Sequence, residues 1–529
     1  MKLRERDGAT RTTSVAYGET LADALRARGY AVEFDCGGRG LCGRCRALVS
    51  IGDAPPTWVK TCQTRVVEEM TVDVSRTPRL DKFEWDPYAA TLAGEIDGAT
   101  EEERRGELGV AVDLGTTTIA CALVSLATNR VLATGATRNP QIAFGRDVLS
   151  RVGRVATEPE AADQMRRLAS RAIGEVVFNS VRKLGGDESQ VKELVVAGNT
   201  TMEYLFSGID PSPLGVAPFA LATSEFPERF GADFDWGVAR LDGARTRVLP
   251  VISAFVGGDI LSGFARLTSR GAFSQDGTAL LLDVGTNGEV VLASKGRFYA
   301  TSTAAGPAFE GGEITQGSLA SPGAINAIEY DASTFAWRAR TLGNVASRGV
   351  CGSGLVDALA GLLAFGALDA SGRFARFGDE VAMELRERFS TVGKSRRFLI
   401  SNPGEGDVWL AQRDIRQAQL AIAAMKAGRR ILLEVGGVDA LDAVYLAGGF
   451  GASLENSNAR RIGLVPERAA TRYVGNASLC GAIDVLTERV PWSRLSELAR
   501  AIEVVDLTAH NFADVFARAM RFPEEDGIE

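Results

Sequence analysis

Hydrophobic and polar residues follow two different periods in the first 76 residues of the chain. Residues 19–28 (ETLADALRAR) place two leucines four residues apart, which is the spacing of an amphipathic helix. Residues 46–51 and 66–74 alternate with a period of two, and we predict that both are strands. A further strand is predicted at residues 12–16. The expected order is a hairpin, a helix, a glycine-rich loop and strands, which is an α+β arrangement.

Two apolar strands that flank a glycine-bearing turn occur twice in the rest of the chain. The first copy begins at residue 108 (LGVAVDLGTTTIACALV) and the second at residue 279 (ALLLDVGTNGEVVL). A later pair of stretches is also alike, residues 193–200 (ELVVAGNT) and residues 443–451 (AVYLAGGFG). In the first half, the turn aspartate, Asp113, lies 84 residues before Ala197 of the later stretch. In the second half, Asp283 lies 164 residues before Ala447. The repeat predicts two related lobes, the second with an insertion within about 300–410.

Each copy carries the motif Asp-x-Gly-Thr between its two strands. A tight Gly-Thr turn lets backbone N–H groups and hydroxyls approach anionic oxygens. The aspartate would repel a phosphate unless a hard divalent cation, which we expect to be Mg²⁺ held through water, lies between them. One such motif alone is most often a plain turn, but two in equivalent places favour phosphate binding. The predicted phosphate-binding residues are Asp113, Gly115, Thr116 and Thr117 in the first turn and Asp283, Gly285, Thr286 and Asn287 in the second.

Four of the seven cysteines lie in one short stretch near the N-terminus. Their spacing is Cys-x5-Cys-x2-Cys, then sixteen residues, then Cys, and the residues are Cys36, Cys42, Cys45 and Cys62. This is close to the Cys-x4-Cys-x2-Cys…Cys loop that holds a plant-type 2Fe–2S cluster. Glycines between the cysteines suit such a loop, because backbone N–H groups must turn toward the sulfides. The four cysteines are therefore the predicted ligands of a 2Fe–2S cluster.

Two alternatives to the cluster remain open from the spacing alone. Zinc sites usually pair their ligands as two Cys-x2-Cys knuckles, whereas this stretch has one knuckle and a more distant pair. Four buried or free thiols are the other alternative. Cys121, Cys351 and Cys480 lie elsewhere and are predicted to be buried small hydrophobic residues.

The charge and composition of the chain argue against several kinds of binding partner and of catalysis. The net charge of −8 argues against nucleic-acid binding, because no basic face would displace counterions. No apolar run approaches eighteen residues and the first residues have no apolar signal core, so we expect no membrane segment and a cytoplasmic protein. Thiols stay reduced there, which favours metal ligation over disulfides. His510 is the only histidine, which nearly excludes histidine-based catalysis.

The repeated motifs resemble those of the actin, heat-shock chaperone and sugar-kinase ATPases. Residues 113–118 are similar to the first phosphate motif of that superfamily, and residues 283–288 to the second. Residues 446–451 are similar to its adenosine motif, so Gly448, Gly449 and Phe450 are predicted to contact the adenosine of ATP. Residues 251–265 resemble the helix that precedes the second phosphate motif.

Together with the cysteine loop, nearly the whole chain resembles the reductive activators of corrinoid proteins. Residues 198–202, 305–311 and 350–355 support this resemblance. It implies a 2Fe–2S cluster, ATP and Mg²⁺ as cofactors, and a homodimer formed through the C-terminal ATPase domain. It also implies ATP-dependent delivery of one electron to the cobalt(II) corrinoid of a methyltransferase-system protein, which restores cobalt(I). The chain departs from the family in the short interval between Cys45 and Cys62, where residues 50–60 are expected to form a brief loop.

The predicted fold is α/β overall, and its N-terminal part is an α+β, β-grasp domain like that of 2Fe–2S ferredoxins. A linker joins this domain to a duplicated RNase H-like ATPase of the actin, heat-shock chaperone and sugar-kinase type. The predicted boundaries are 1–76 for the ferredoxin-like domain, 77–107 for the linker, 108–250 for the first ATPase lobe and 251–529 for the second.

Acidic residues near the turns are candidates for catalysis. Asp259 is predicted to orient the attacking water, although its place at a helix start is equally typical of an N-cap carboxylate. Glu289 is a weaker candidate for the same role, and so is Glu310. Two other functions remain open: an ATP-coupled electron donor to another low-potential enzyme, and a redox-gated ATPase or binding protein.

Overall fold

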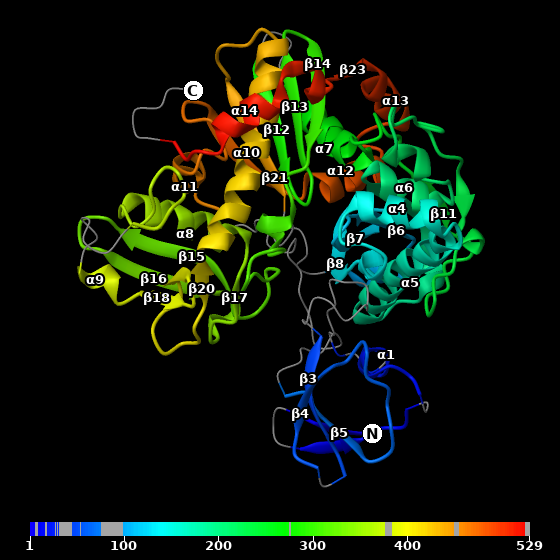
Figure 1. The fold of residues 1–529 in the computed structure, drawn as a ribbon. Helices are drawn as coiled ribbons and strands as arrows, with labels where there is room; N and C mark the ends of the chain where they lie inside the picture. The colour runs from blue at the N-terminus through cyan, green and yellow to red at the C-terminus, as the bar shows by residue number, and fades with distance from the viewer. Residues whose placement is uncertain are drawn as a thin grey trace.

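The structure is a computed structural model of the 529-residue chain (Figure 1). It describes residues 1–5, 9–15, 18–26, 28, 30, 45–52, 54–75, 99–273, 277–375, 383–448 and 454–523. Among these residues, no helix is both long and apolar enough to span a membrane.

The N-terminal residues form a five-stranded sheet and one helix. The strand order is β2-β1-β5-β3-β4, with β1 parallel to β5 and the other pairs antiparallel. Leu21 and Leu25, on the helix, lie in the buried core of this domain. The elements are β1 (Lys2–Arg4), β2 (Thr10–Thr12), α1 (Leu21–Arg26), β3 (Arg46–Ile51), β4 (Thr57–Lys60) and β5 (Met70–Asp73).

Two local predictions for this domain were wrong. The strand expected at residues 12–16 does not form over the described residues 13–15, because the hairpin lies earlier, at Lys2–Arg4 and Thr10–Thr12. The expected loop at residues 50–60 contains β4, which pairs with β3. Thr, Trp and Val in β4 favour extended backbone, and this preference outweighs the two prolines that precede it.

The first lobe is built on a six-stranded sheet of order β10-β11-β9-β6-β7-β8. Strands β6, β7 and β8 are antiparallel neighbours, whereas β9 is parallel to β6 and β11 is parallel to β9. Helix α5 packs on β7 and β8. The elements are α3 (Glu101–Arg105), β6 (Leu108–Leu114), β7 (Thr118–Ser125), β8 (Val131–Arg138), α4 (Val148–Thr157), α5 (Glu160–Lys183), β9 (Val191–Gly198), α6 (Thr200–Ser207), β10 (Arg229–Phe230) and β11 (Arg245–Val248).

The second lobe repeats this order in the sheet β22-β21-β12-β13-β14-β23. Strands β12, β13 and β14 are again antiparallel, β21 is parallel to β12, and β22 is parallel to β21. Even the register is repeated, because Asp113 pairs with Ala197 and Asp283 pairs with Ala447. The predicted duplication is confirmed. The sheet elements are β12 (Thr278–Val284), β13 (Gly288–Ser294), β14 (Arg297–Thr303), β21 (Ala443–Gly448), β22 (Ala470–Gly475) and β23 (Ile502–Val504).

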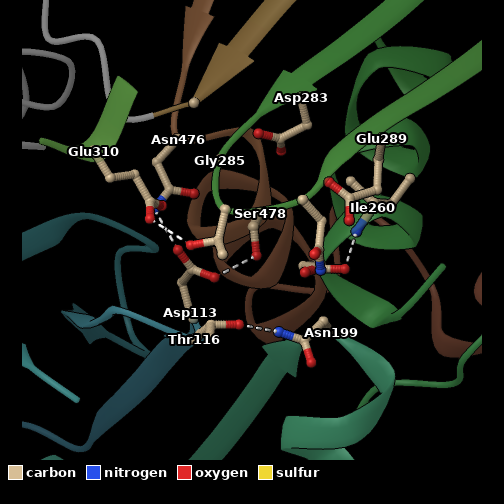
Figure 2. Close-up of a pocket in the computed structure, with 15 residues that line it drawn as sticks. Asp113, Thr116, Asn199, Ile260, Asp283, Gly285, Glu289, Glu310, Asn476 and Ser478 are labelled. Atoms are coloured by element: carbon tan, nitrogen blue, oxygen red, sulfur yellow. Dashed lines mark hydrogen bonds between the residues drawn. The ribbon is translucent and has the colours of Figure 1, made fainter. Parts of the chain in front are cut away.

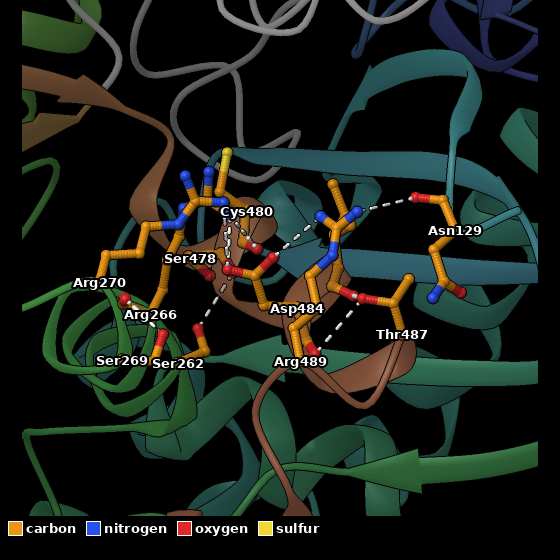
Figure 3. A network of polar contacts seen from close by, with 11 residues as sticks. Asn129, Ser262, Arg266, Ser269, Arg270, Ser478, Cys480, Asp484, Thr487 and Arg489 are labelled. Atoms are coloured by element: carbon orange, nitrogen blue, oxygen red, sulfur yellow. Dashed lines mark hydrogen bonds and ion pairs between the residues drawn. The ribbon is translucent and has the colours of Figure 1, made fainter.

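Helices α7 (Gly258–Ser269) and α12 (Ala477–Leu486) pack on each other between the two lobes (Figure 1). Their apolar side chains share one buried core with residues of both sheets. Asp484 of α12 is buried and forms an ion pair with Arg266 of α7 (Figure 3). The Nη1 atom of Arg266 lies 2.6 Å from Oδ2 of Asp484. Arg489 contacts the same carboxylate and donates to the carbonyl of Asn129 in the first lobe. The helix pair therefore joins the lobes by both apolar and ionic contacts.

The region of the predicted insertion forms two small sheets beside the second lobe (Figure 1). Helix α8 packs on the first of them, and the long helix α10 packs on β13 and β14. The elements are β15 (Ala324–Asp331), β16 (Ala336–Thr341), β17 (Gly349–Val350), α8 (Gly352–Ala364), α9 (Met383–Arg386), β18 (Phe389–Val392), β19 (Ser395–Leu399), β20 (Trp409–Ala411) and α10 (Gln412–Val435). Helices α11 (Asn456–Arg461), α13 (Trp492–Ala501) and α14 (Phe512–Ala519) complete the C-terminal half.

Candidate functional site

A pocket lies where the two glycine-bearing turns face each other (Figure 2). Strands β6 and β12 each end at one turn, and the paired lobes bring the two strand ends together. The residues that line the pocket are Asp113, Gly115, Thr116, Asn199, Asp259, Ile260, Asp283, Gly285, Thr286, Asn287, Glu289, Glu310, Gly448, Asn476 and Ser478.

Most of the residues predicted from the sequence come together in this pocket. It contains three of the four residues expected in the first turn, all four expected in the second, and the three candidate catalytic residues Asp259, Glu289 and Glu310. The hydroxyl of the remaining residue, Thr117, contacts Glu310, which lines the pocket. Of the predicted adenosine contacts, Gly448 lines the pocket, whereas Gly449 and Phe450 lie outside the described residues.

Asn199, Asn476 and Ser478 line the pocket but were not predicted. Asn199 is the N-cap of α6 and Asn476 is the N-cap of α12, so each begins a helix at the pocket. The N-cap pattern was present in the sequence, and it is the signal that could have located both asparagines. Their position in the pocket depends on distant parts of the chain, which the pattern does not reveal.

Close contacts leave no room for a Cβ at Gly115 in the first turn or at Gly288, the residue that follows the second turn. The Gly115 N–H donates to the carbonyl of Thr118 at 3.0 Å, and a Cβ on Gly115 would lie 2.6 Å from that oxygen. In the second turn, the Gly285 N–H donates to the carbonyl of Asn287 at 3.0 Å. A Cβ on Gly288 would lie 2.2 Å from the sulfur of Met425. In both turns a glycine N–H therefore donates to a carbonyl later in the turn, from Gly115 to Thr118 in the first and from Gly285 to Asn287 in the second, so the second turn is one residue shorter.

Glu310 connects the two turns across the pocket. The Thr117 hydroxyl donates to Glu310 Oε2 at 2.9 Å, and the Thr286 hydroxyl donates to the same oxygen. The two threonine oxygens lie 3.2 Å apart. Burial raises the pKa of Glu310, and the two hydroxyls oppose this effect. A single carboxylate thus contacts hydroxyls from both lobes.

Asp113 is held by two donors from the start of α12 (Figure 2). Asn476 Nδ2 lies 2.6 Å from one carboxylate oxygen, and Ser478 Oγ lies 2.9 Å from the other. Burial raises the pKa of Asp113 to about 6, although both hydrogen bonds favour the charged form. Thr116, in the same turn, accepts a hydrogen bond from Asn199 at 2.9 Å.

The other pocket carboxylates repel one another. Burial and the charges of Asp259 and Asp113 raise the pKa of Asp283 to about 8. Burial and the charge of Asp113 raise the pKa of Asp259 to about 7. Burial also raises the pKa of Glu289 well above its usual range. Several carboxylates in one buried pocket favour the binding of a cation among them.

Direct coordination of a metal ion by a tight cluster of side chains is not found here. Within the described part of the chain, no three histidine, cysteine, aspartate or glutamate side chains are arranged to hold a metal ion. The pocket carboxylates do fit a hydrated divalent cation, because oxygen ligands and water suit Mg²⁺.

Asp259 is not the N-cap of its helix, although one of its carboxylate oxygens accepts the backbone N–H of Ile260 at 2.8 Å. The N-cap of α7 is Gly257, and Asp259 lies in the first turn with its side chain in the pocket. The alternative prediction of an N-cap carboxylate is therefore wrong. Behind it, buried Glu203 accepts hydrogen bonds from the N–H groups of Gly198 and Gly258, at 3.0 and 3.3 Å. These bonds join β9 to the start of α7 and fix the position of Asp259.

Two of the four predicted cluster ligands lie among the described residues. Cys45 and Cys62 are buried in the N-terminal domain, and their sulfurs are 3.3 Å apart without a disulfide. Cys36 and Cys42 lie outside the described residues. A close pair of reduced thiols fits an iron–sulfur cluster, whose ligands are cysteine thiolates. Cys121, Cys351 and Cys480 are buried, as predicted.

Family models match three successive parts of the chain. The model for a 2Fe-2S iron-sulfur cluster binding domain matches residues 5–70. The model for the RACo middle region matches residues 108–268, and the model for the C-terminal domain of RACo, the ASKHA domain, matches residues 277–528. The chain therefore joins a 2Fe–2S cluster binding domain to an ATPase-like fold of the actin and sugar-kinase class.

Known proteins with the same combination are similar over much of the chain. A solved structure of a reductive activator for a corrinoid, iron-sulfur protein has a TM-score of 0.72 and 26% identity, covering 99% of both chains. The corrinoid activation enzyme RamQ of Eubacterium limosum is 31% identical over 396 residues, which are 72% of this chain and 65% of RamQ. The chain thus aligns with slightly less than two thirds of that relative's length.

A second curated relative is the Co(II) methylated amine-specific corrinoid protein reductase of Methanosarcina barkeri. It is 27% identical over 416 residues, which are 74% of this chain and 72% of that protein. The chain has the domains and the fold of the reductive activators of corrinoid proteins, and the resemblance predicted from its motifs is confirmed.

Proposed function

We propose that this protein is an ATP-dependent reductive activator of a corrinoid protein. It delivers one electron from its 2Fe–2S cluster to the cobalt(II) corrinoid of a methyltransferase-system protein and restores cobalt(I). The observation that carries the proposal is the presence, on one chain, of a cluster-binding domain and a pocket between two facing phosphate-type turns. Relatives named for corrinoid activation and corrinoid reduction share these parts.

ATP binds in the pocket with its phosphates between the two turns and its adenosine near Gly448. Mg²⁺ lies among the pocket carboxylates, held through water by Asp113 and Asp283. Its positive charge would offset the burial and the neighbouring charges that raise the pKa values of these groups. Asp259 orients the attacking water, because it lies in the same pocket and its own helix is capped by Gly257.

The need for ATP follows from redox energetics. A plant-type cluster has a potential near about −400 mV, and reduction of a cobalt(II) corrinoid is more demanding. Each ~59 mV of unfavourable difference lowers the equilibrium yield about tenfold, or ~1.4 kcal/mol. ATP does not carry the electron. ATP binds one arrangement of the two lobes more tightly than the other and so increases the population of that arrangement. The protein in this arrangement then favours a state of the corrinoid that accepts the electron more readily.

Two further features belong to the proposal. The protein forms a homodimer through its C-terminal ATPase domain, and it acts in the cytoplasm, where its thiols remain reduced. Size-exclusion chromatography of the full chain with light scattering tests the first feature, and a mass of two chains is expected.

An anaerobic electron-transfer assay tests the function. The chemically reduced protein is mixed with a candidate corrinoid protein in the cobalt(II) state, with and without Mg²⁺ and ATP, and cobalt(I) is followed by its absorbance. Cobalt(I) is expected only with nucleotide. The matched control is Cys62→Ser, which is expected to retain ATP binding but to form no cobalt(I).

The assay also separates the alternatives. An intact iron signal without cobalt(I) in the presence of ATP would assign the electron to another acceptor. An ATPase rate that is unchanged by cobalt(II) corrinoid protein would favour a redox-gated ATPase. Protein that is purified anaerobically and contains zinc, or no metal, would contradict the cluster itself.

A further inference from the structure

The carbonyl groups of the first turn are held from behind by two residues outside the turn. Asn139 Nδ2 donates to the carbonyl of Gly115 at 2.8 Å, and its backbone N–H donates to the carbonyl of Thr117 at 2.8 Å. Arg151 donates from Nη2 to the carbonyl of Thr116 at 2.5 Å. Three successive carbonyls therefore have a partner on the side away from the pocket.

Arg151 is an unusual residue for this position because its side chain is fully buried. Its relative exposure is 0%, and its remaining contacts are with the carbonyl of Gly145, the side-chain oxygen of Gln141 and the sulfur of Met202. Among the described residues no carboxylate forms an ion pair with it. The charge of Asp147 acts on Arg151 electrostatically, but the Asp147 carboxylate accepts its hydrogen bonds from Ser150 at the start of α4.

A buried cation without an anionic partner is expensive, and a counter-charge usually offsets this cost. Burial lowers the pKa of Arg151 to about 9, and the charge of Asp147 acts in the opposite direction, so the guanidinium remains charged near pH 7. It lies directly behind the turn at which the anionic phosphates of ATP are expected to bind. A phosphate group in front of the turn would supply the missing counter-charge.

We propose that Arg151 and Asn139 are positioning residues that orient the first phosphate turn and make it electropositive, and that they thereby select nucleotides by the number of phosphates. The inference rests on the proposed binding of ATP in the pocket. Neither residue contacts the nucleotide. Asn139 fixes the turn through two carbonyls, and Arg151 fixes the third and supplies the charge.

The second turn has no comparable support among the described residues. The carbonyl of Thr286 accepts a hydrogen bond from the backbone N–H of Gly306 at 2.9 Å, and no arginine donates to that turn. The buried cation thus belongs to one turn of the duplicated pair, so it is not a general requirement of the fold.

The experiment compares the binding of ATP, ADP and adenosine to the full chain by isothermal titration calorimetry. The variant Arg151→Met removes the charge and the hydrogen bonds with little change in volume. It is expected to weaken ATP binding at least tenfold, to weaken ADP binding less, and to change adenosine binding less than twofold. Arg151→Lys keeps the charge and is expected to recover most of the loss for ATP.

Two further variants separate positioning from stability. Asn139→Ser keeps a side chain that can cap the helical turn after it but removes the bond to Gly115, and it is expected to weaken ATP binding several-fold. Arg429→Met removes another buried arginine, which donates to the carbonyl of Leu464 away from the pocket. It is expected to lower the melting temperature as Arg151→Met does, without changing the ratio of ATP to adenosine affinity.

The possible results have distinct meanings. Equal weakening of all three ligands by Arg151→Met, or unchanged ATP binding in a folded variant, would overturn the inference. Failure of Arg151→Lys to recover any ATP affinity would overturn the role of the charge. If the unmodified protein binds no ATP, the proposed function fails instead, and this result is seen before any variant is measured.

Discussion

The two turns of the pocket occupy equivalent places in the duplicated sheets but differ in length and in their supports, because four residues separate the paired Leu114 and Ile119 and three separate Val284 and Gly288. Each follows a buried strand, closes with a glycine N–H bond, and begins at an aspartate that pairs with an alanine of the neighbouring parallel strand. In the first turn, both oxygens of Asp113 accept hydrogen bonds from α12. In the second turn, no hydrogen bond to the Asp283 carboxylate is found among the described residues, and Thr286 instead contacts Glu310.

This difference indicates which turn is preformed. The donors to Asp113 lie on a helix that is packed between the lobes, so they are fixed before any ligand binds. The Glu310 side chain lies at the end of a single 3₁₀ turn, Pro307–Glu310, between Gly306 and Gly311, whose φ angles are 80° and 76°. Because the duplication kept the place of each turn and not its supports, we expect the first turn to be rigid and the second to respond to ligand.

The largest expected effect comes from loosening the helix that supports the first turn. Asp484→Asn leaves Arg266 and Arg489 beside a neutral side chain in the interface between the lobes (Figure 3). Asp484 is buried but Arg266 is 22% exposed, so removal of the carboxylate is expected to cost about 2–3 kcal/mol of stability, less than the loss of a partner in a fully buried pair. We expect a lower melting temperature by calorimetry and weaker ATP binding, because α12 also carries the donors to Asp113.

The exposed pair Arg297–Glu503 provides the control for this prediction. Glu503→Gln is expected to cost less than about 1 kcal/mol, because exposed ion pairs contribute little. If Asp484→Asn melted like Glu503→Gln, the ionic contacts between the helices would not stabilise the support of the first turn.

The second prediction compares the two turn aspartates directly. Both Asp113→Ala and Asp283→Ala are expected to lower Mg²⁺-dependent ATP hydrolysis by about 10- to 100-fold, as loss of a residue that orients metal ligands usually does. Their effects on stability should differ in sign. Asp113→Ala leaves Asn476 and Ser478 without their acceptor and should cost about 1–3 kcal/mol.

Asp283→Ala removes a carboxylate that is repelled by its neighbours and has no donor, so the variant should be as stable as the unmodified protein, or more stable, without Mg²⁺. Thermal melts with and without Mg²⁺ check this contrast. Equal destabilisation by the two variants would show that the turns are supported alike.

The third prediction concerns pH in Mg²⁺-free buffer. The pKa of Asp283 is raised from 3.8 to about 8 in the folded protein, so the folded state binds more protons than the unfolded state between these values. Stability therefore falls as pH rises through this window, by up to ~1.4 kcal/mol per pH unit for one group. Asp259, with a pKa of about 7, acts in the same direction.

Melting temperatures from pH 6 to pH 8 test this prediction. Asp283→Asn should make the decline shallower, and Mg²⁺ with ATP should remove most of it in the unmodified protein. A melting temperature that rose over this range without Mg²⁺ would contradict the repulsion among the pocket carboxylates.

The sequence allowed the backbone of the pocket to be predicted because that backbone is local. A buried strand, an Asp-x-Gly-Thr turn and a second strand are contiguous, and their repetition predicted the paired sheets. The supports could not be predicted in this way. Asn476 lies 363 residues from Asp113 in the chain, and its contact exists only after the lobes pack around α12.

Errors arose where a neighbouring segment decides the local structure. The N-cap of α7 is Gly257, so the carboxylate of Asp259 is available to the pocket, although a helix-start aspartate commonly caps. Strand β4 forms because β3 offers it an antiparallel partner, in a stretch expected to be a loop. Arg151 gave no signal in the sequence, because a single arginine on a helix is usually exposed.

The smallest expected effect tests whether Glu310 is the responsive part of the second turn. Its carboxylate contacts the hydroxyls of Thr117 and Thr286, which are the groups expected to face the phosphates of ATP. A charged carboxylate and a phosphate cannot share these hydroxyls without repulsion. Glu310→Gln keeps an acceptor oxygen and removes the charge, so ATP should bind about threefold to tenfold more tightly without Mg²⁺, since a nearby like charge costs on the order of 1 kcal/mol.

The gain in affinity should be largest for ATP and smallest for adenosine. Calorimetric titration of each variant with ATP, ADP and adenosine measures this gain. Glu310→Ala is the matched variant, because it removes the acceptor together with the charge. If both variants bind ATP more tightly, Glu310 competes with the phosphates and must move when ATP binds. If both weaken it, Glu310 is a fixed support like those of Asp113, and the two turns differ less than their contacts indicate.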